Sequence, residues 1–510
     1  MITRRHFLQG TSAWTALGGL CAMGEASAQT ASNYKALVCI FLAGGNDTFN
    51  TVLATDTASW DAYTAVRNQQ PSPIALLAPG VAPDASRAAG SPERLGGVLA
   101  LNPLTPVANR SFALHPRLSS LRTLFDTQRR LAIVANVGAL VQPLTKDQVL
   151  AAQRGAANSS AIQLPSKLYS HNDQQNTWQA LSPEGARVGW GGRLVDAFVG
   201  ASAQPSYYGA ISLSGNAVWL SGNRVRQYQL GAGGAVALGA SSGNTNNTIY
   251  GSKALAESIR RIASNGLAGA NASTTGRVSH VLMADMGTVS ERSIKAESSL
   301  TAAFAANPVT AAPLGPDTRL KYTNLNGAQA TNNLAVQLQS VARVIAARST
   351  LGVGRQVFFV QMGGFDTHDN QNVGQGDLMA RLDHAMAYFD ETLGLLGVQN
   401  QVTTFTASDF GRTFTSNGDG TDHGWGAHHF VMGGAVRGGQ IYGSFPQFGI
   451  KNSRDNSFDS PDQLFNGVLL PTTSVEQLGA TLARWFEVSD INAVFPNLRN
   501  FRSSDLGFLT

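Results

Sequence analysis

The chain has 510 residues, of which 43% are hydrophobic and 14% charged, and 37 Lys and Arg against 32 Asp and Glu leave a formal net charge of +5. This composition is too apolar for a disordered chain. No apolar run reaches the roughly 20 residues of an ordinary membrane span, so none is expected in the mature chain. The charges form no blocks or Lys-rich tails, and nucleic acid is therefore not expected as a partner.

Residues 1–28 have the three parts of a twin-arginine signal peptide. The motif TRRHFLQ at residues 3–9 is followed by a short apolar stretch at 15–23 and by the small-residue cleavage site Ala26-Ser27-Ala28. We therefore expect the twin-arginine export machinery as a partner. The mature protein is expected to be periplasmic or secreted.

Removal of residues 1–28 would leave Cys39 as the single cysteine. A single cysteine forms no internal disulfide, even in an oxidising compartment. Cys39 lies within an apolar run, and we interpret it as a core residue rather than a nucleophile.

Strand and helix patterns alternate along the rest of the chain. Continuous apolar runs, typical of strands buried on both faces, lie at 36–42, 131–138, 208–213, 356–362 and 402–407. Amphipathic helix patterns lie at 117–130, 378–396 and 475–488. The alternation predicts an α/β fold with a mainly parallel sheet flanked by helices, in one domain over 29–510. A Gly- and Asn-rich helical insertion or cap is predicted at about 224–330.

Carboxylates and histidines cluster just after several predicted strands. In open α/β sheets, ligands bind beyond the carboxyl ends of the strands, where separate segments meet. Mixed carboxylate oxygens and imidazole nitrogens suit Zn, Mn or Fe, and we expect a divalent metal, with Zn or Mn favoured. The candidate ligands are Asp47, Asp366, His368, Asp409, Asp422, His423 and His428.

The sequence context indicates a metal ligand more strongly for some of these candidates than for others. Asp47 is equally compatible with capping a helix or making a turn. The strongest group is Asp422, His423, His428 and His429, which we place together in one Gly-rich loop.

Two further residues are candidates for catalysis. Ser170 opens a predicted helix, where it serves either as an N-cap or as a nucleophile, because a helix N-terminus also favours negative charge. His171 is a candidate for a residue that contacts a metal ligand without binding the metal itself. Arg412 would either clamp a phosphate or sulfate in bidentate fashion or pair with a nearby Asp.

The twin-arginine signal and a series of motifs in a fixed order resemble one exported bacterial family, filed as domain of unknown function 1501. The resemblance covers most of the mature chain. Its motifs are FLAGGND (41–47), FALHP (112–116), LAIVANVG (131–138), SHNDQQ (170–175), GFDTH (364–368), SDFGRT (408–413) and TDHG (421–424).

The family as a whole is similar to the alkaline phosphatase and sulfatase superfamily, which implies an alkaline-phosphatase-like fold, one or two metals and a Ser/Thr nucleophile. Carried over by residue, Asp47 matches the early metal Asp, Ser170 the nucleophile, and Asp366 with His368 the other metal. The late Asp-His-Gly matches Asp422-His423-Gly424 by spelling.

By strand position that late motif matches Asp409 instead, with Phe410 where a His would stand. His428 or His429 would then be the last ligand. The modified-cysteine signature of ordinary sulfatases is absent, because Cys39 is in the wrong place.

These observations lead to three functional hypotheses. The first is an exported metal-dependent hydrolase that acts on a phosphate- or sulfate-type ester of a small molecule or polymer. The second is a non-catalytic binding or assembly protein of the cell envelope on the same fold. The third is a mononuclear iron enzyme that binds the metal through His368, His423 and Asp366.

Overall fold

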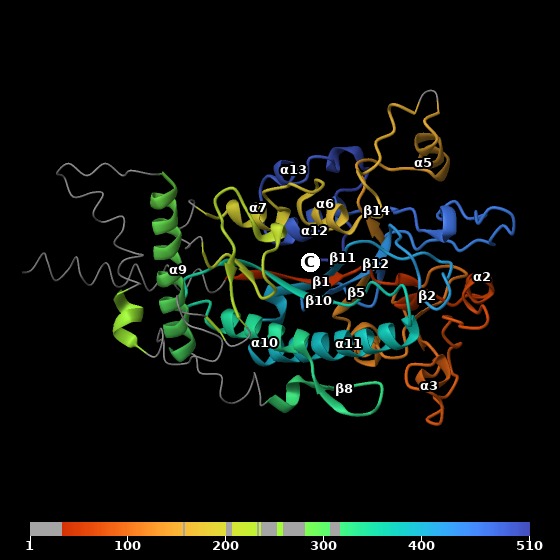
Figure 1. Cartoon of the computed structure of the whole chain (residues 1–510), viewed down its shortest axis with the longest axis horizontal. Coiled ribbons are helices and arrows are strands. Elements are labelled where there is room, and N and C mark those ends of the chain that lie inside the picture. The colour runs from red at the N-terminus through yellow and green to blue at the C-terminus, as the bar shows by residue number, and fades with distance from the viewer. Residues whose placement is uncertain are drawn as a thin grey trace, which may run out of the picture.

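The structure is a computed structural model that describes residues 33–156, 159–199, 207–231, 234–235, 252–258, 281–306 and 317–510. Within these residues one large sheet crosses the middle of the molecule (Figure 1). Residues 1–28, the predicted signal peptide, lie outside the described residues.

The large sheet has the strand order β13-β5-β12-β11-β1-β10-β6-β7, and β14 adds to β5. All of these strands run parallel except β12, which is antiparallel to both of its neighbours. The predicted α/β class with a mainly parallel sheet is thereby confirmed. The strands are β1 (Lys35–Ala43), β5 (Leu131–Gly138), β6 (Ala210–Ser212), β7 (Tyr228–Gln229), β10 (Arg355–Gly363), β11 (Val402–Ser408), β12 (Ala427–Met432), β13 (Ile441–Tyr442) and β14 (Thr473–Ser474).

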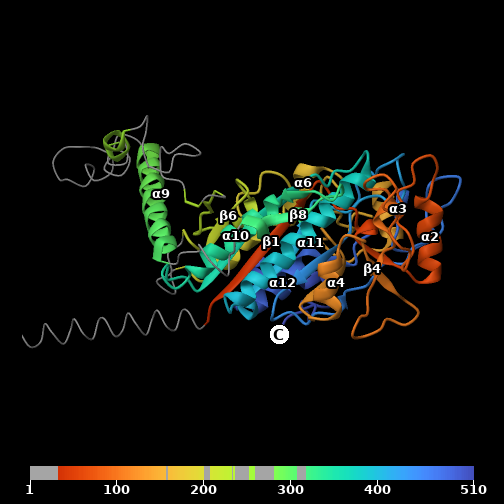
Figure 2. The ribbon, with the colours of Figure 1, turned by 90° about the horizontal axis from the view of Figure 1, so that it is seen from below.

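Helices cover both faces of this sheet (Figures 1 and 2). One face packs on α4 (Ser119–Asp126), α10 (Asn333–Ala346) and α11 (Gln371–Leu395). The other packs on α6 (His171–Ala180), α7 (Trp190–Asp196), α12 (Val475–Trp485) and α13 (Ile491–Val494). The continuous apolar runs of the central strands follow from this arrangement, since both faces of the sheet are buried.

The remaining elements lie around this three-layer body. A small antiparallel sheet and a hairpin are formed by β2 (Val52–Ala54), β3 (Leu99–Ala100), β4 (Phe112–Leu114), β8 (Lys321–Thr323) and β9 (Gln329–Thr331). The other helices are α2 (Thr57–Arg67), α3 (Pro92–Leu95), α5 (Lys146–Gln153) and α9 (Val281–Ala306). Helix α9 belongs to the predicted insertion, and much of the rest of that insertion lies outside the described residues.

Two local differences from the sequence expectations matter for the site. Helix α11 begins at Gln371, seven residues before the predicted start, which brings its N-terminus close to the Asp366–His368 segment. His428 and His429 lie in strand β12 inside the sheet rather than in a Gly-rich loop. None of the described helices has both the length and the apolar character needed to cross a membrane.

Candidate metal centre

The segments that follow β1, β10 and β11 meet at one edge of the sheet, because these three strands are parallel and adjacent. Gly44, directly after β1, has a φ of +117°, and a Cβ at this position would lie 2.4 Å from the backbone nitrogen of Asp366. Glycine therefore allows the segment after β1 to touch the segment after β10.

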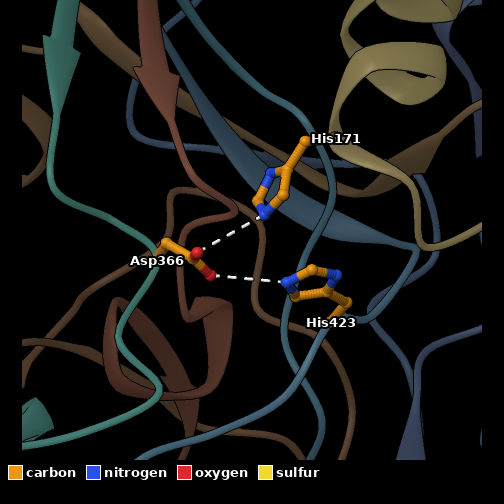
Figure 3. Close-up of side chains that lie close together, drawn as sticks. All are labelled: His171, Asp366 and His423. Atoms are coloured by element: carbon orange, nitrogen blue, oxygen red, sulfur yellow. Dashed lines mark ion pairs between the residues drawn. The ribbon is translucent and has the colours of Figure 1, made fainter.

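Three side chains converge at this edge (Figure 3). His171 comes from the first residue of α6, Asp366 from the segment after β10, and His423 from the segment before β12. The Nε2 atom of His171 lies 3.4 Å from Oδ2 of Asp366, and Nε2 of His423 lies 3.4 Å from Oδ1. One ligand atom from each residue can be chosen so that all three lie within 4.8 Å of one another.

The other ring nitrogen of each histidine is held by an oxygen that accepts a hydrogen bond. Nδ1 of His171 lies 2.7 Å from the carboxylate of Asp409, and Nδ1 of His423 lies 2.8 Å from the backbone carbonyl of Tyr169. Since a carbonyl or an ionised carboxylate only accepts, each Nδ1 carries the proton. In the neutral rings, Nε2 then presents a lone pair toward Asp366, which is the arrangement of metal-binding histidines.

The protonation equilibria of the three groups differ. Burial lowers the pKa of His423, which favours the neutral ring that a metal requires. The hydrogen bond to Asp409 raises the pKa of His171. Burial alone would raise the pKa of Asp366, but the hydrogen bond and charge of Arg412 outweigh it and lower that pKa, so Asp366 is an anion.

His368 borders the same cluster. Its Nδ1 lies 3.1 Å from Asp422, while its Nε2 lies 3.1 Å from Oδ1 of Asp366 and 3.0 Å from Nε2 of His423. If the Nδ1 of His368 carries the proton and donates it to Asp422, the Nε2 lone pairs of the neutral His368 and His423 rings face each other. A cation between these atoms removes that repulsion.

The distances fit a metal ion. Nitrogen and oxygen ligands lie about 2.0–2.2 Å from a zinc ion, which places two ligand atoms of one tetrahedral site about 3.3 Å apart. Nε2 of His423 and Nε2 of His368 approach the same oxygen of Asp366 at 3.4 and 3.1 Å, close to this spacing, whereas His171 approaches the other oxygen at 3.4 Å. His171, Asp366 and His423 would hold the ion, with His368 close enough to join them, and the donor set suits Zn, Mn or Fe.

Asp409 and Asp422 contact the histidines of the cluster, whereas the sequence predicted both as metal ligands. Asp409, predicted as a ligand, accepts hydrogen bonds from His171, Gln175 and the backbone N–H of Gly44, so its oxygens orient His171 instead. Asp422, also predicted as a ligand, contacts His368 and Asn417.

Ser170 is the N-cap residue of α6 but makes no side-chain capping bond. Its hydroxyl donates instead to Oδ2 of Asp173 at 2.8 Å, which leaves the oxygen lone pairs available. Tyr169, before it, has a φ of +74°, an uncommon value for a bulky residue, and its carbonyl accepts the hydrogen bond of His423. The strained residue therefore connects Ser170 and His171 to His423.

Of the two alternatives for Arg412, an anion clamp or a pair with a nearby Asp, the structure shows a pair with Asp366. Its guanidinium is buried and donates to Asp366 at 2.6 Å, to the carbonyls of Gly44 and Thr421, and to the Thr421 hydroxyl. These contacts use four of the five guanidinium N–H groups.

Asp47 is not positioned as a ligand. It is fully buried and forms a bidentate ion pair with Arg67 of α2, with contacts of 2.6 and 3.0 Å. It also caps a short helical turn through the backbone N–H of Phe49. The local role of Asp47 is therefore that of a capping residue, one of the alternatives that the sequence left open.

His428 and His429 are not positioned as ligands either. Nδ1 of His428 accepts from the backbone N–H of Asn136, and its ring stacks on Phe445. The ring of His429 packs edge-on against Trp178. Both rings are buried between apolar groups, and burial lowers both pKa values to about 3.

The sequence analysis did not predict His171 as a ligand. One signal was available, because His171 directly follows Ser170 at a predicted helix start, where this edge of the sheet was already expected. Its partners Asp366 and His423 lie 195 and 252 residues further along the chain, so spacing alone could not bring them together.

Fold and site together define an α/β protein with a histidine–carboxylate cluster at the carboxyl edge of its sheet. The chain belongs to the family described as "Protein of unknown function (DUF1501)", whose model matches residues 34–496. No curated protein matches the sequence.

Among solved structures, the chain is similar to one labelled "4S-sulf", from work on the metabolism of multiple glycosaminoglycans by Bacteroides thetaiotaomicron. The two share 9% sequence identity and a TM-score of 0.30, over 90% of this chain and 73% of the other.

Proposed function

We propose that the chain is an exported metal-dependent hydrolase of phosphate- or sulfate-type esters. The observation that carries the proposal is the convergence of His171, His423 and Asp366, with both Nδ1 atoms held by acceptors. Three protein ligands with a further open position are typical of catalytic zinc sites.

The exposure of the centre supports access by a substrate. The side chain of Asp366 is 45% exposed and that of His171 is 29% exposed, so the ligand atoms lie at the surface rather than in a closed core. A divalent cation bound there would polarise an ester oxygen and lower the pKa of a bound hydroxyl or water.

Ser170 supplies the candidate nucleophile. Its hydroxyl proton points at Asp173, a carboxylate positioned to accept it, and Ser170 is adjacent to the ligand His171. The free N–H groups at the start of α6 favour an anionic ester in front of this serine. The expected substrate is therefore an anionic ester, one of whose oxygens the metal would bind.

The second candidate is a non-catalytic cell-envelope protein on the same fold. The buried guanidinium of Arg412 favours it, since four of its five N–H groups already donate to protein oxygens. A centre of two histidines and one carboxylate also matches mononuclear iron enzymes.

Metal analysis combined with hydrolysis assays separates these candidates. Purified protein is equilibrated with Zn²⁺ or Mn²⁺, and metal content is measured together with hydrolysis of p-nitrophenyl phosphate and p-nitrophenyl sulfate. The proposal expects bound metal and hydrolysis, both lost in Asp366→Ala. His429→Phe, in the interior of the sheet, serves as the matched control and should keep both.

Other results would select other functions. Folded protein that binds no metal and keeps its melting temperature after chelation contradicts every enzymatic candidate. Bound iron with oxygen uptake selects the iron enzyme.

A further inference from the structure

We propose that Gln371, the first residue of α11, is a positioning residue that sets the separation between Asp366 and His423. The inference rests on the metal centre proposed above and concerns a residue outside the ligand cluster. Gln371 is fully buried, so its amide must satisfy both its donor and its acceptor within the protein.

The amide of Gln371 joins three segments. Its Nε2 donates to Oδ2 of Asp47 at 2.6 Å. Its Oε1 accepts from the hydroxyl of Thr421 at 2.6 Å and from the hydroxyl of Thr367 at 3.3 Å. Thr367 lies between Asp366 and His368, and Thr421 lies two residues before His423.

The two threonines also contact each other, and Arg412 links Thr421 to the ligand Asp366. The backbone N–H of Thr421 donates to the carbonyl of Thr367 at 3.0 Å. Arg412 donates to Thr421 and holds Oδ1 of Asp366 at 2.6 Å. A change at the Gln371 oxygen is therefore transmitted to both ligand segments.

Asp47 and Arg67 fix the orientation of this amide. Because Asp47 accepts from Arg67, it requires a donor from Gln371, and the amide oxygen must then face the threonines. Arg67 also donates to the backbone carbonyls of Thr413 and Phe414. The backbone N–H of Thr413 in turn donates to the carbonyl of Asp422, next to His423. The buried ion pair thus anchors both sides of the loop that carries His423.

Gln375 offers a matched control one helical turn later on α11. It is equally buried, and its amide donates to Asn46, to Thr51 and to the carbonyl of Asp47. Its recorded hydrogen bonds go to the segment after β1 and to neither ligand segment. Loss of this amide would cost stability without moving Asp366 or His423.

The test compares Gln371→Met with Gln375→Met in the full chain. Zn²⁺ affinity is measured by chelator competition, the visible spectrum of bound Co²⁺ reports ligand geometry, and the melting temperature of the metal-free protein reports stability. We expect both variants to lower the melting temperature. Only Gln371→Met should weaken Zn²⁺ binding, by about 10- to 100-fold, and shift the Co²⁺ spectrum.

Thr421→Val keeps the test decisive if Gln371→Met fails to fold. It preserves shape but removes the hydroxyl between Gln371 and Arg412, and should weaken Zn²⁺ binding in the same direction. Unchanged Zn²⁺ affinity and Co²⁺ spectrum in the folded variants would overturn the positioning role. A wild-type chain that binds neither ion overturns the metal centre itself, and the positioning role with it.

Discussion

Two pairs of histidines that are neighbours in space have opposite environments. His423, with its neighbour in space His368, lies at the edge of the sheet, with each Nδ1 facing an acceptor and each Nε2 facing Asp366. His428 and His429 lie within β12, where successive side chains point to opposite faces of the sheet. Their Nε2 atoms are buried without a hydrogen-bond partner.

From this difference we infer that the proposed metal binding depends on what holds the second ring nitrogen. An acceptor on Nδ1 leaves the Nε2 lone pair for a cation, whereas His428 uses the Nδ1 lone pair to accept from Asn136. His428 therefore carries its proton on Nε2. The residue type is the same in the two pairs, and His423 lies only five residues before His428, so the surroundings separate them.

The largest effect is expected when the edge pair is broken. His423→Ala removes one ligand atom, so Zn²⁺ affinity should fall by more than about 100-fold and hydrolysis of p-nitrophenyl esters should fall to background. Metal content and initial rates measure both. His423→Ala protein with full metal content would show that the edge histidines are not ligands.

Ser170→Ala separates catalysis from metal binding at the edge. The variant loses the hydroxyl that faces Asp173, and hydrolysis should fall by about 1000-fold or more. Metal content should stay at the wild-type level, because Ser170 contributes no ligand atom. A Ser170→Ala enzyme with wild-type rates would remove Ser170 from the reaction.

The interior pair should govern stability in acid. Burial lowers the pKa of His428 and His429 from 6.5 to about 3, and that of His115 likewise. The unfolded chain then binds more protons than the native chain below pH 6.5, so stability is full above that pH and falls as the pH decreases. Each ring contributes a few kcal/mol over this range.

Replacement of an interior histidine sharpens this prediction. His429→Phe should flatten the fall in unfolding free energy between pH 6 and 4 by up to one proton, as measured by denaturant titration at several pH values. An unchanged slope would mean that His429 is not buried as a neutral ring.

The smallest effect is expected at the partner of an edge histidine. The hydrogen bond to Asp409 raises the pKa of His171, so protons compete with the metal at higher pH than at an ordinary histidine. Asp409→Asn should weaken metal binding about 10-fold near neutral pH, because the neutral amide orients His171 less firmly and makes it a less basic ligand. The lower pKa of His171 should at the same time move the loss of metal in acid to lower pH. Metal titrations from pH 5 to 8 measure both changes, and a shift to higher pH would contradict the assigned contact.

The sequence was sufficient for the parts of the fold with a strong local pattern. The apolar runs of β1, β5, β10 and β11 predicted these strands, and their shared carboxyl edge predicted that Asp366 and His423 would meet. The antiparallel strand β12 was missed, because a His-His pair after glycines has no strand pattern.

The remaining site residues depend on partners distant in sequence. Asp47 was predicted as a ligand from its place after a predicted strand. Its partner Arg67 lies on α2, a helix that the sequence analysis did not predict. The role of Gln371 depends on Asp47, Thr367 and Thr421 together, and no spacing rule relates a glutamine to such a set.

The most direct test of the metal centre is a crystal structure of protein equilibrated with Zn²⁺, with anomalous scattering recorded at the zinc edge. We expect one peak about 2.0–2.2 Å from Nε2 of His171, Nε2 of His423 and a carboxylate oxygen of Asp366. No peak among these atoms in Zn²⁺-equilibrated crystals, or a peak at His428 and His429 instead, would contradict the proposed metal centre.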